Sequence, residues 1–311
     1  METPFTRLVG CRLPLQQAGM GGSATAALAA AVSGAGALGM LGVAGLPPEV
    51  VAAAVADAAD RSSGPFGVNF LMPFLDRAAV AATAGRARVI EFFYGEPDAG
   101  LVGQAHDLGA LVSWQVGSLD EAKRAADSGC DLIVAQGTEA GGHVRGEVGL
   151  LPLLDLILGA VEVPVVAAGG LGSARSVATV LRAGAAAARV GTRFLAADEA
   201  DVHPRYLDAL LESRAEDTVL TTAFSNLWPD APHRVLRSCV AAATDVDDDI
   251  VGETEVAPGL RLPVPRLSPP TPSRSTTGRI DAMALYAGQS VDHVRRRQKA
   301  ADIVAELTAD L

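Results

Sequence analysis

The sequence predicts an α/β fold: a (β/α)₈ TIM barrel with a small lid subdomain inserted before the C-terminal helix. Short, almost continuously apolar runs alternate with alanine-rich stretches that favour helices. Such runs are typical of parallel strands that are covered on both faces. Eight of them fall within about 190 residues, which suits a closed barrel. An open, doubly wound sheet is the alternative.

The predicted strands and helices follow one another in strict alternation. The strands are Leu13–Gln17, Ala37–Leu41, Phe66–Leu71, Val89–Tyr94, Ala110–Gln115, Leu132–Gln136, Val163–Ala168 and Ala187–Val190. The helices are Thr25–Ser33, Pro48–Asp60, Pro73–Gly85, Glu96–Leu108, Ser118–Ser128, Leu151–Ala160 and Ser173–Ala183. Ser118 and Glu121 have the spacing of a capping box, which supports one of these helix starts.

The alternation ends after Gly191. We therefore expect a barrel over residues 1–196, a lid with a proline-rich connection over 197–280, and a C-terminal helical segment over 281–311 that returns to the barrel. The lid should hold a long helix from about Ala197, followed by a polar stretch that contains the acidic segment Asp245–Asp249. Gln289–Leu311 is expected to form one helix.

Composition excludes several classes of function. The 311 residues include 25 basic and 36 acidic side chains, and a net charge of −11 disfavours binding to nucleic acid. No charged residue occurs between Arg12 and Glu49, but this stretch is rich in alanine and glycine. It reads as buried core rather than as a membrane span.

Cysteine and histidine give no sign of a disulfide framework or a metal site. The chain has three widely spaced cysteines and five scattered histidines, without the spacing of zinc ligands. We expect no bound metal and a cytoplasmic protein, and the sequence leaves a homodimer open.

Glycine-rich loops follow the predicted strands at the end where barrels hold their active sites. The loop after the sixth strand, Gln136–His143, ends in a histidine that could move protons. A histidine that only bonds a loop carbonyl is an equally good interpretation. Gly169 and Gly170 follow the seventh strand, and Gly191 and Thr192 follow the eighth. Loops in these two positions commonly bind phosphate.

Three amide side chains also lie at or near the ends of predicted strands. Asn69, Gln115 and Gln136 can satisfy the donor and acceptor edges of a heteroaromatic ring. Ala18, Gly19 and Met20 follow the first strand. A cofactor with a flat ring and a single phosphate would use all these features, although each amide alone could be a strand-end cap.

Several of these segments resemble the nitronate monooxygenase family, formerly called 2-nitropropane dioxygenases. They are Gln17–Met20, Gly67–Met72, Ala135–His143, Val166–Gly170, Val190–Phe194 and Tyr286–Ser290. That family shares an FMN-binding TIM barrel with a flavin-dependent enoyl-acyl-carrier-protein reductase and a related NADH:quinone reductase. The resemblance therefore implies FMN and the barrel more specifically than it implies the reaction.

The resemblance also assigns residues. It places FMN against Ala18, Gly19, Met20, Asn69, Gln115, Gln136, Gly141 and Gly142, with the phosphate on Gly169, Gly170, Gly191 and Thr192. His143 matches the family's active-site histidine, proposed to remove the α-proton of a nitroalkane or to interact with bound substrate. Tyr286 and Ser290 are expected to line the substrate pocket.

The implied reaction is FMN-dependent oxidation of alkyl nitronates, and of nitroalkanes, by O₂ to a carbonyl compound and nitrite. The alternative is an NAD(P)H-dependent FMN reductase acting on enoyl thioesters or quinones, and a flavin-binding protein without turnover is a third interpretation. The chain departs from the family at two points. It has Ala18-Gly19 where Ala-Pro or Gly-Gly is usual, and Gln115 where some relatives carry lysine.

Overall fold

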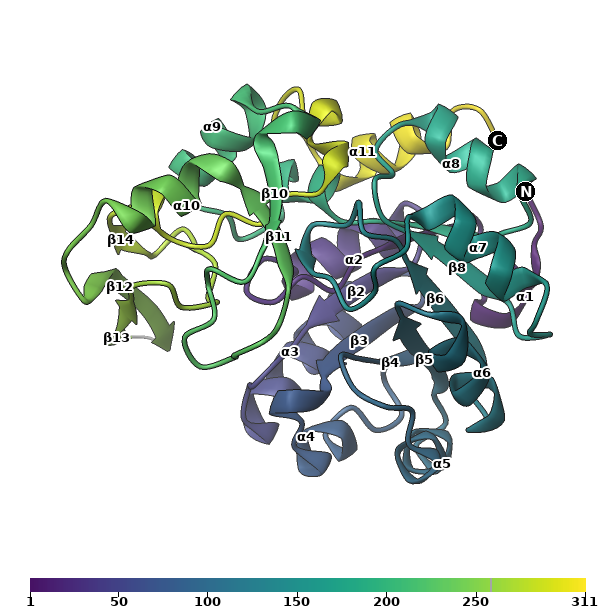
Figure 1. Cartoon of the computed structure of the whole chain (residues 1–311). Helices are drawn as coiled ribbons and strands as arrows, with labels where there is room; N and C mark the ends of the chain where they lie inside the picture. The colour runs from purple at the N-terminus through teal and green to yellow at the C-terminus, as the bar shows by residue number, and fades with distance from the viewer. Residues whose placement is uncertain (258) are drawn as a thin grey trace.

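The computed structural model describes residues 1–257 and 259–311, and within them eight parallel strands form a barrel (Figure 1). The strands are β1 (Leu15–Gln17), β2 (Gly39–Gly42), β3 (Phe66–Leu71), β4 (Val89–Phe93), β5 (Leu111–Val116), β6 (Leu132–Gln136), β8 (Val165–Ala168) and β9 (Ala187–Val190). Their order is β1-β9-β8-β6-β5-β4-β3-β2. A parallel bridge between Gln16 and Leu38 joins the two ends of this order, so the predicted barrel is confirmed.

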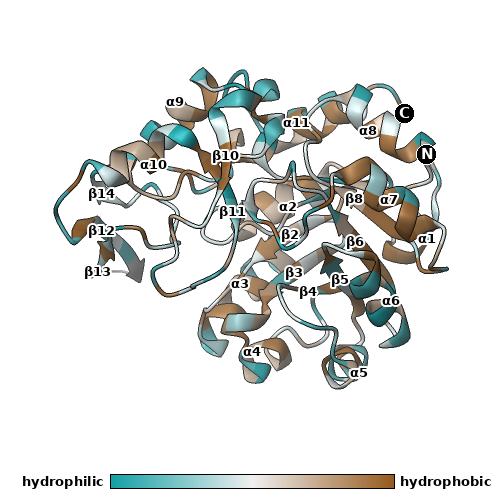
Figure 2. Ribbon diagram, in the orientation of Figure 1, coloured by the Kyte–Doolittle hydropathy of each residue, from teal (hydrophilic) through white to brown (hydrophobic). Residues whose placement is uncertain are grey.

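Helices cover the outside of the barrel. They are α2 (Ala26–Gly34), α3 (Pro48–Arg61), α4 (Arg77–Ala81), α5 (Ala99–Asp107), α6 (Leu119–Asp127), α7 (Leu150–Leu158) and α8 (Ala174–Arg182). The C-terminal helix α11 (Ala300–Leu307) packs against both α8 and α2 and so takes the eighth position in the ring. Figure 2 shows hydrophobic residues on β8 and much of α7, whereas α6 carries hydrophilic ones.

Side-chain caps explain several helix starts. The Ser118 hydroxyl accepts a hydrogen bond from the backbone N–H of Glu121 at 3.2 Å. The Glu121 carboxylate, however, accepts from the backbone of Gly117 at 2.7 Å, so only half of the predicted capping box forms. The helix predicted over Pro73–Gly85 shortens to α4 because a 3₁₀ turn, η1 (Met72–Phe74), precedes it and Asp76 caps it.

A short helix, α1 (Pro4–Val9), closes the end of the barrel opposite the loops that follow the strands. The sequence analysis did not identify it. Phe5 and Val9 are fully buried and pack with interior residues of the barrel, including Met40 and Val134. The uncharged stretch between Arg12 and Glu49 forms β1, α2 and β2. Among the described helices, none has both the length and the apolar character needed to cross a membrane.

The lid segment contains more strand than the sequence predicted. Its elements are α9 (Pro204–Glu212), η3 (Ala215–Asp217), β10 (Thr218–Thr221), β11 (His233–Leu236), α10 (Arg237–Thr244), β12 (Ile250–Ala257), β13 (Leu260–Pro265) and β14 (Thr277–Gly278). The expected long helix is only α9, which starts at Pro204, and the polar stretch forms the β12–β13 hairpin. Pro263 and Pro265 are compatible with β13 because it is an edge strand.

The C-terminal segment is not the single helix predicted for Gln289–Leu311. A 3₁₀ turn, η5 (Gln289–His293), is followed by an extended stretch before α11. In that stretch the backbone of Gln298 donates to Ala196 at 3.0 Å and accepts from Asp198 at 2.9 Å. Bonds to η2 (Thr192–Ala196) and to the chain after it therefore replace helical ones.

We expect Phe5→Ala to lower the free energy of unfolding by about 3–5 kcal/mol, because it opens a cavity in the closed end of the barrel. Urea unfolding followed by circular dichroism measures this loss. Arg7→Ala on the same helix removes only an exposed ion pair with Glu2 and should change stability by less than about 1 kcal/mol. Equal losses in the two variants would show that α1 does not seal the barrel.

Candidate active site

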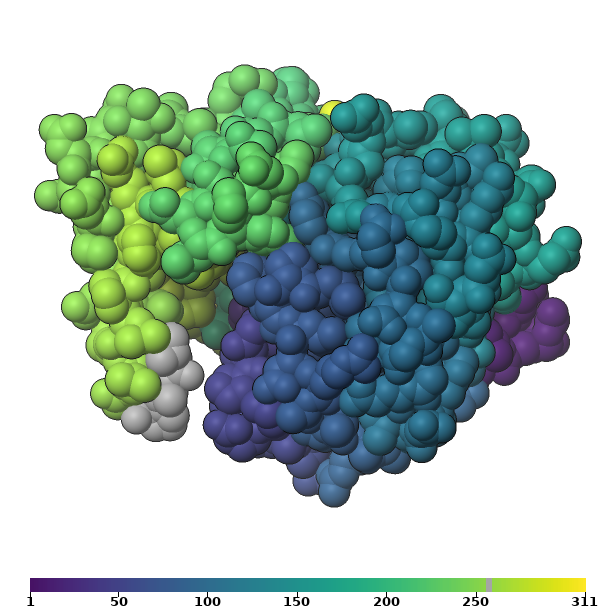
Figure 3. All heavy atoms as spheres, turned by 60° about the horizontal axis from the view of Figure 1, so that its bottom comes forward, coloured from purple at the N-terminus to yellow at the C-terminus, as the bar shows by residue number. Residues whose placement is uncertain are grey.

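A strand of the lid pairs with the loop that carries His143. β7 (Gly142–His143) and β11 are antiparallel, with His233 opposite His143 and Arg234 opposite Gly142. The Arg234 guanidinium also donates twice to the carbonyl of Thr138, at 2.8 and 3.0 Å. Figure 3 shows the lid seated against the barrel. The position of His143 is thus fixed by residues distant in the sequence.

Aromatic side chains surround the His143 imidazole. The Trp228 indole stacks on it, with ring centroids 3.9 Å apart and planes at 24°. Tyr94, Tyr286 and His233 have ring centroids 5.8, 5.6 and 5.2 Å from it. The Nε2 atom is buried and has no hydrogen-bond partner within the described part of the chain. This nitrogen is therefore free to bond a ligand.

Burial, together with a smaller effect of the neighbouring His233, lowers the pKa of His143 to about 3. Burial also lowers the pKa of His233. Both rings are consequently neutral near pH 7. A neutral imidazole can accept a proton at Nε2, or donate from it in the other tautomer, but it places no positive charge in the site.

Trp228 connects the lid to two loops of the barrel. Its ring packs edge-on against Phe74, at 5.0 Å between centroids, and against Tyr94, at 4.8 Å. The Arg145 guanidinium lies 5.7 Å from the centre of the Tyr94 ring. Burial raises the pKa of Tyr94 to about 12, with Arg145 acting in the opposite direction. This aromatic contact covers His143 from one side.

The loop after β1 lies against the end of β3. A Cβ atom on Gly19 would be 2.5 Å from the Cβ of Asn69, so only glycine fits there. The backbone of Ala18 donates to Val190 at 2.9 Å, and Met20 contacts the backbone at Gly42. The structure therefore brings Ala18, Gly19 and Met20 beside Asn69, as the sequence analysis expected of one site.

The three predicted amides lie on β3, β5 and β6 and are buried. The Gln136 amide nitrogen donates to the carbonyl of His143 at 3.0 Å, while its Oε1 is buried without a partner among the residues described. The Asn69 amide nitrogen donates to Glu91 at 2.8 Å. Gln115 is 5% exposed, on the neighbouring strand to Gln136.

The residues predicted to hold a phosphate follow two paired strands: Gly169 and Gly170 lie between β8 and α8, and Gly191 and Thr192 follow β9. Gly169 and Gly170 have φ angles of 118° and 68°, a left-handed conformation that favours glycine. A Cβ on Gly191 would be 3.4 Å from that of Ala18. The Thr192 hydroxyl accepts from the backbone of Gly288 at 3.0 Å and keeps its own hydrogen for a ligand.

The remaining predicted residues make contacts with the lid and the C-terminal segment. A Cβ on Gly141 would be 2.4 Å from the backbone nitrogen of Gly288, so this glycine permits contact with the C-terminal segment. Gly142 pairs with Arg234 on β11. Tyr286 lies beside His143 and donates from its hydroxyl to Pro269 at 2.8 Å. The Ser290 side chain lies against Gly172, which follows the predicted phosphate glycines Gly169 and Gly170. It is not among the rings around His143.

Sequence reasoning missed four residues near the site: Glu91, which accepts from Asn69, its ion-pair partner Arg189, and the two ring neighbours of His143, Trp228 and His233. The first two carried a usable signal, because each is a charged residue within an otherwise apolar predicted strand. Trp228 and His233 carried no signal in the sequence that pointed to the site. Their place in the site depends on β11, which lies about ninety residues beyond His143 along the chain and was not predicted.

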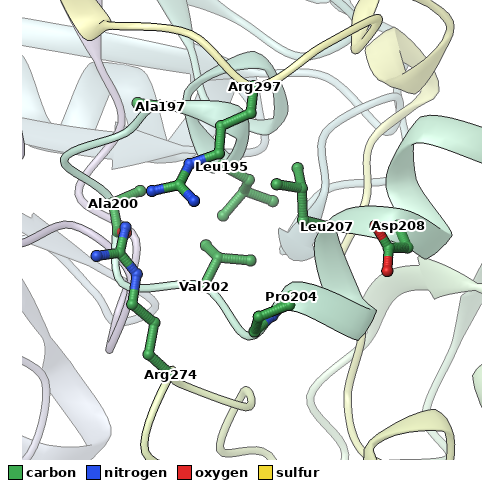
Figure 4. Close-up of a pocket in the computed structure, with 9 residues that line it drawn as sticks. All are labelled: Leu195, Ala197, Ala200, Val202, Pro204, Leu207, Asp208, Arg274 and Arg297. Carbon is green, nitrogen blue, oxygen red and sulfur yellow. The ribbon is translucent and has the colours of Figure 1, made fainter.

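A cavity of about 380 Å³ lies away from these residues (Figure 4). Its lining is Leu195, Ala197, Ala200, Val202, Pro204, Leu207, Asp208, Arg274 and Arg297. Arg297 pairs with Asp198 at 2.8 Å, and Arg274 donates to the carbonyls of Asp198 and Ala200. Since no predicted site residue lines it, this cavity is separate from the candidate active site.

Comparison with known proteins identifies relatives along most of the chain. The model of the nitronate monooxygenase family matches residues 2–84 and 72–310. A Mycobacterium tuberculosis protein named (3aS,4S,5R,7aS)-5-hydroxy-7a-methyl-1-oxo-octahydro-1H-indene-4-carboxyl-CoA dehydrogenase is 35% identical over 244 residues. That alignment covers 76% of this chain and 67%, about two thirds, of the relative.

Two solved structures share the whole fold. FabK from Thermotoga maritima has a TM-score of 0.81 and 26% identity, with 99% of this chain and 95% of that chain covered. A nitroalkane oxidase from Streptomyces ansochromogenes has a TM-score of 0.79 and 28% identity, with 99% and 98% covered. The similarity therefore includes the lid and the C-terminal segment as well as the barrel.

Acid should destabilise the folded protein partly through His143. In the unfolded chain the His143 imidazole takes up a proton as the pH falls below about 6.5. In the folded protein the same ring stays neutral down to a pH of about 3. The free energy of unfolding then falls by up to about 1.4 kcal/mol per pH unit through that interval. His143→Phe removes this contribution, so urea unfolding at pH 6.5 and 4.5 should show a smaller loss than in the wild type. The same loss in both proteins would contradict a His143 that stays neutral in the folded protein.

Proposed function

Because the chain belongs to the nitronate monooxygenase family, which consists of flavin-dependent oxidoreductases, we propose that it uses FMN to oxidise alkyl nitronates with O₂. The products would be a carbonyl compound and nitrite. The observation that carries the proposal is the neutral His143, whose unpartnered Nε2 lies in an aromatic enclosure beside the amides of the barrel mouth. The nitroalkane oxidase that shares this fold supports the same class of substrate.

The residues of this site fit a flavin mononucleotide. Gln136 offers a buried, unpartnered oxygen to a ring donor, and Gly19 leaves the end of β3 open to close approach. Gly169, Gly170 and the start of α8 would hold the phosphate through backbone N–H groups, together with the Thr192 hydroxyl. When bound, the flavin supplies the electron-transfer chemistry between nitronate and O₂.

The electrostatics of His143 favour a nitronate over a neutral nitroalkane. A base whose conjugate acid has a pKa of about 3 removes a carbon-bound proton poorly. An already ionised nitronate needs no such step. In the tautomer protonated at Nε2, His143 would donate a hydrogen bond to a nitronate oxygen and orient it. The rings of Trp228, Tyr94 and Tyr286 would exclude water around the alkyl group.

A second candidate is an NAD(P)H-dependent FMN reductase that passes hydride to enoyl thioesters or quinones. The Mycobacterium tuberculosis relative is named a carboxyl-CoA dehydrogenase, and FabK shares the complete fold. Gln115 is compatible with either reaction, since it would contact a flavin without adding charge.

The two candidates differ in the electron donor. Purified protein with bound FMN should keep its oxidised flavin absorbance when NADH or NADPH is added without oxygen, and should lose it on addition of ethyl nitronate. Admission of O₂ should then release nitrite. Rapid bleaching by a nicotinamide nucleotide, with no bleaching by the nitronate, would instead establish the second candidate.

Gly170→Asp should empty the flavin site. The left-handed φ of 68° disfavours a side chain, and a carboxylate at this position would repel the phosphate. Flavin content per protein, measured by absorbance, should fall more than tenfold. Gly170→Asn is the matched control, because it has the same shape without the charge and tolerates a left-handed conformation. Wild-type flavin content in Gly170→Asp would refute the phosphate assignment.

A further inference from the structure

Five polar residues form a hydrogen-bonded cluster inside the barrel, which we call the Glu91 cluster. Glu91 lies on β4, and the other members are Gln16 on β1, Asn69 on β3, Ser113 on β5 and Arg189 on β9. All are at most 6% exposed. The Glu91 carboxylate accepts hydrogen bonds from Arg189 at 2.6 Å, Asn69 at 2.8 Å, Gln16 at 3.2 Å and Ser113 at 3.4 Å.

Strand register explains why these residues meet. Asn69 pairs with Glu91 and Glu91 with Ser113 on neighbouring strands, while Gln16 pairs with Arg189. The cluster is therefore one layer of the barrel interior. On the side of α1, the interior is apolar and includes Met40, Val89 and Val134. On the other side are the strand ends that form the candidate active site.

Stability alone does not account for this cluster. A buried ion pair costs desolvation, and apolar residues of similar volume often replace one without loss. The Glu91 carboxylate has only acceptor atoms, so the Asn69 side chain must turn its NH₂ group toward it. The Oδ1 of Asn69 is then left for another partner. Glu91 also balances the charge of Arg189 within the barrel.

We propose that Glu91 is a positioning residue for the flavin: it fixes the Asn69 amide so that Oδ1 accepts from the cofactor, and it neutralises Arg189 beneath the cofactor. This inference rests on the proposed function, because it places FMN against Asn69. Glu91 then has two separable effects. By orienting the Asn69 amide it raises the affinity for FMN. By balancing the charge of Arg189 it sets the reduction potential of the bound flavin.

Three variants separate these effects. Glu91→Gln can offer either end of its amide to Asn69, so the Asn69 orientation is no longer fixed, and it leaves Arg189 without a counter-charge. Glu91→Gln/Arg189→Met removes the charge imbalance but leaves Asn69 unfixed. Ser113→Ala is the matched control, since it removes only the longest contact of the same carboxylate.

FMN dissociation is measured by fluorescence quenching of protein stripped of flavin and then titrated, and the midpoint potential by dye-equilibrated reduction. Glu91→Gln should bind FMN about tenfold more weakly. It should also raise the midpoint potential, because uncompensated positive charge favours the reduced, anionic flavin. The double variant should regain the wild-type potential but not the affinity. Ser113→Ala should match the wild type in both.

The results distinguish this inference from the proposed function. Wild-type protein that binds no FMN would overturn the proposed cofactor and this inference with it. Wild-type binding together with unchanged affinity and potential in Glu91→Gln would overturn the inference alone. If Glu91→Gln does not fold, the charge-neutral double variant decides, because wild-type affinity in it would exclude the positioning role.

Discussion

The pairing of β11 with β7 is the interaction on which the site depends. β7 has only two residues, too few to hold a defined position by itself. Its partner strand fixes His143 through backbone hydrogen bonds and brings His233 opposite it. The lid is thus an integral wall of the site, and its aromatic residues reach His143 because this short strand pair holds both sides in register.

That pairing also determines the chemistry available to His143. Once β11 is in place, Trp228 and His233 replace water around the imidazole, and burial keeps the ring neutral. A neutral ring beside the amides of the barrel mouth suits recognition of an anionic substrate by hydrogen bonding more than proton removal from carbon. The polar Glu91 cluster lies deeper in the barrel, so the site has an aromatic outer wall and a charge-balanced base.

The barrel was predictable because its signal is local. Each strand is a short apolar run, and β3, β6 and β9 have the predicted bounds. The glycines in the loops that follow the strands could be identified from the sequence equally well. The lid was harder, since the hairpin β12–β13 contains prolines that its edge position tolerates. The extended stretch before α11 depends on bonds to residues about a hundred positions earlier, which no local pattern reveals. The aromatic wall depends on the same kind of distant pairing.

The most direct test of this account is a crystal structure of the protein with FMN bound. We expect the flavin ring within hydrogen-bond distance of Gln136 Oε1 and Asn69 Oδ1. The phosphate should lie at Gly169 and Gly170, and His143 Nε2 should face the ring. Flavin in the separate cavity beside Arg274 and Arg297, or a phosphate away from the two glycines, would contradict it.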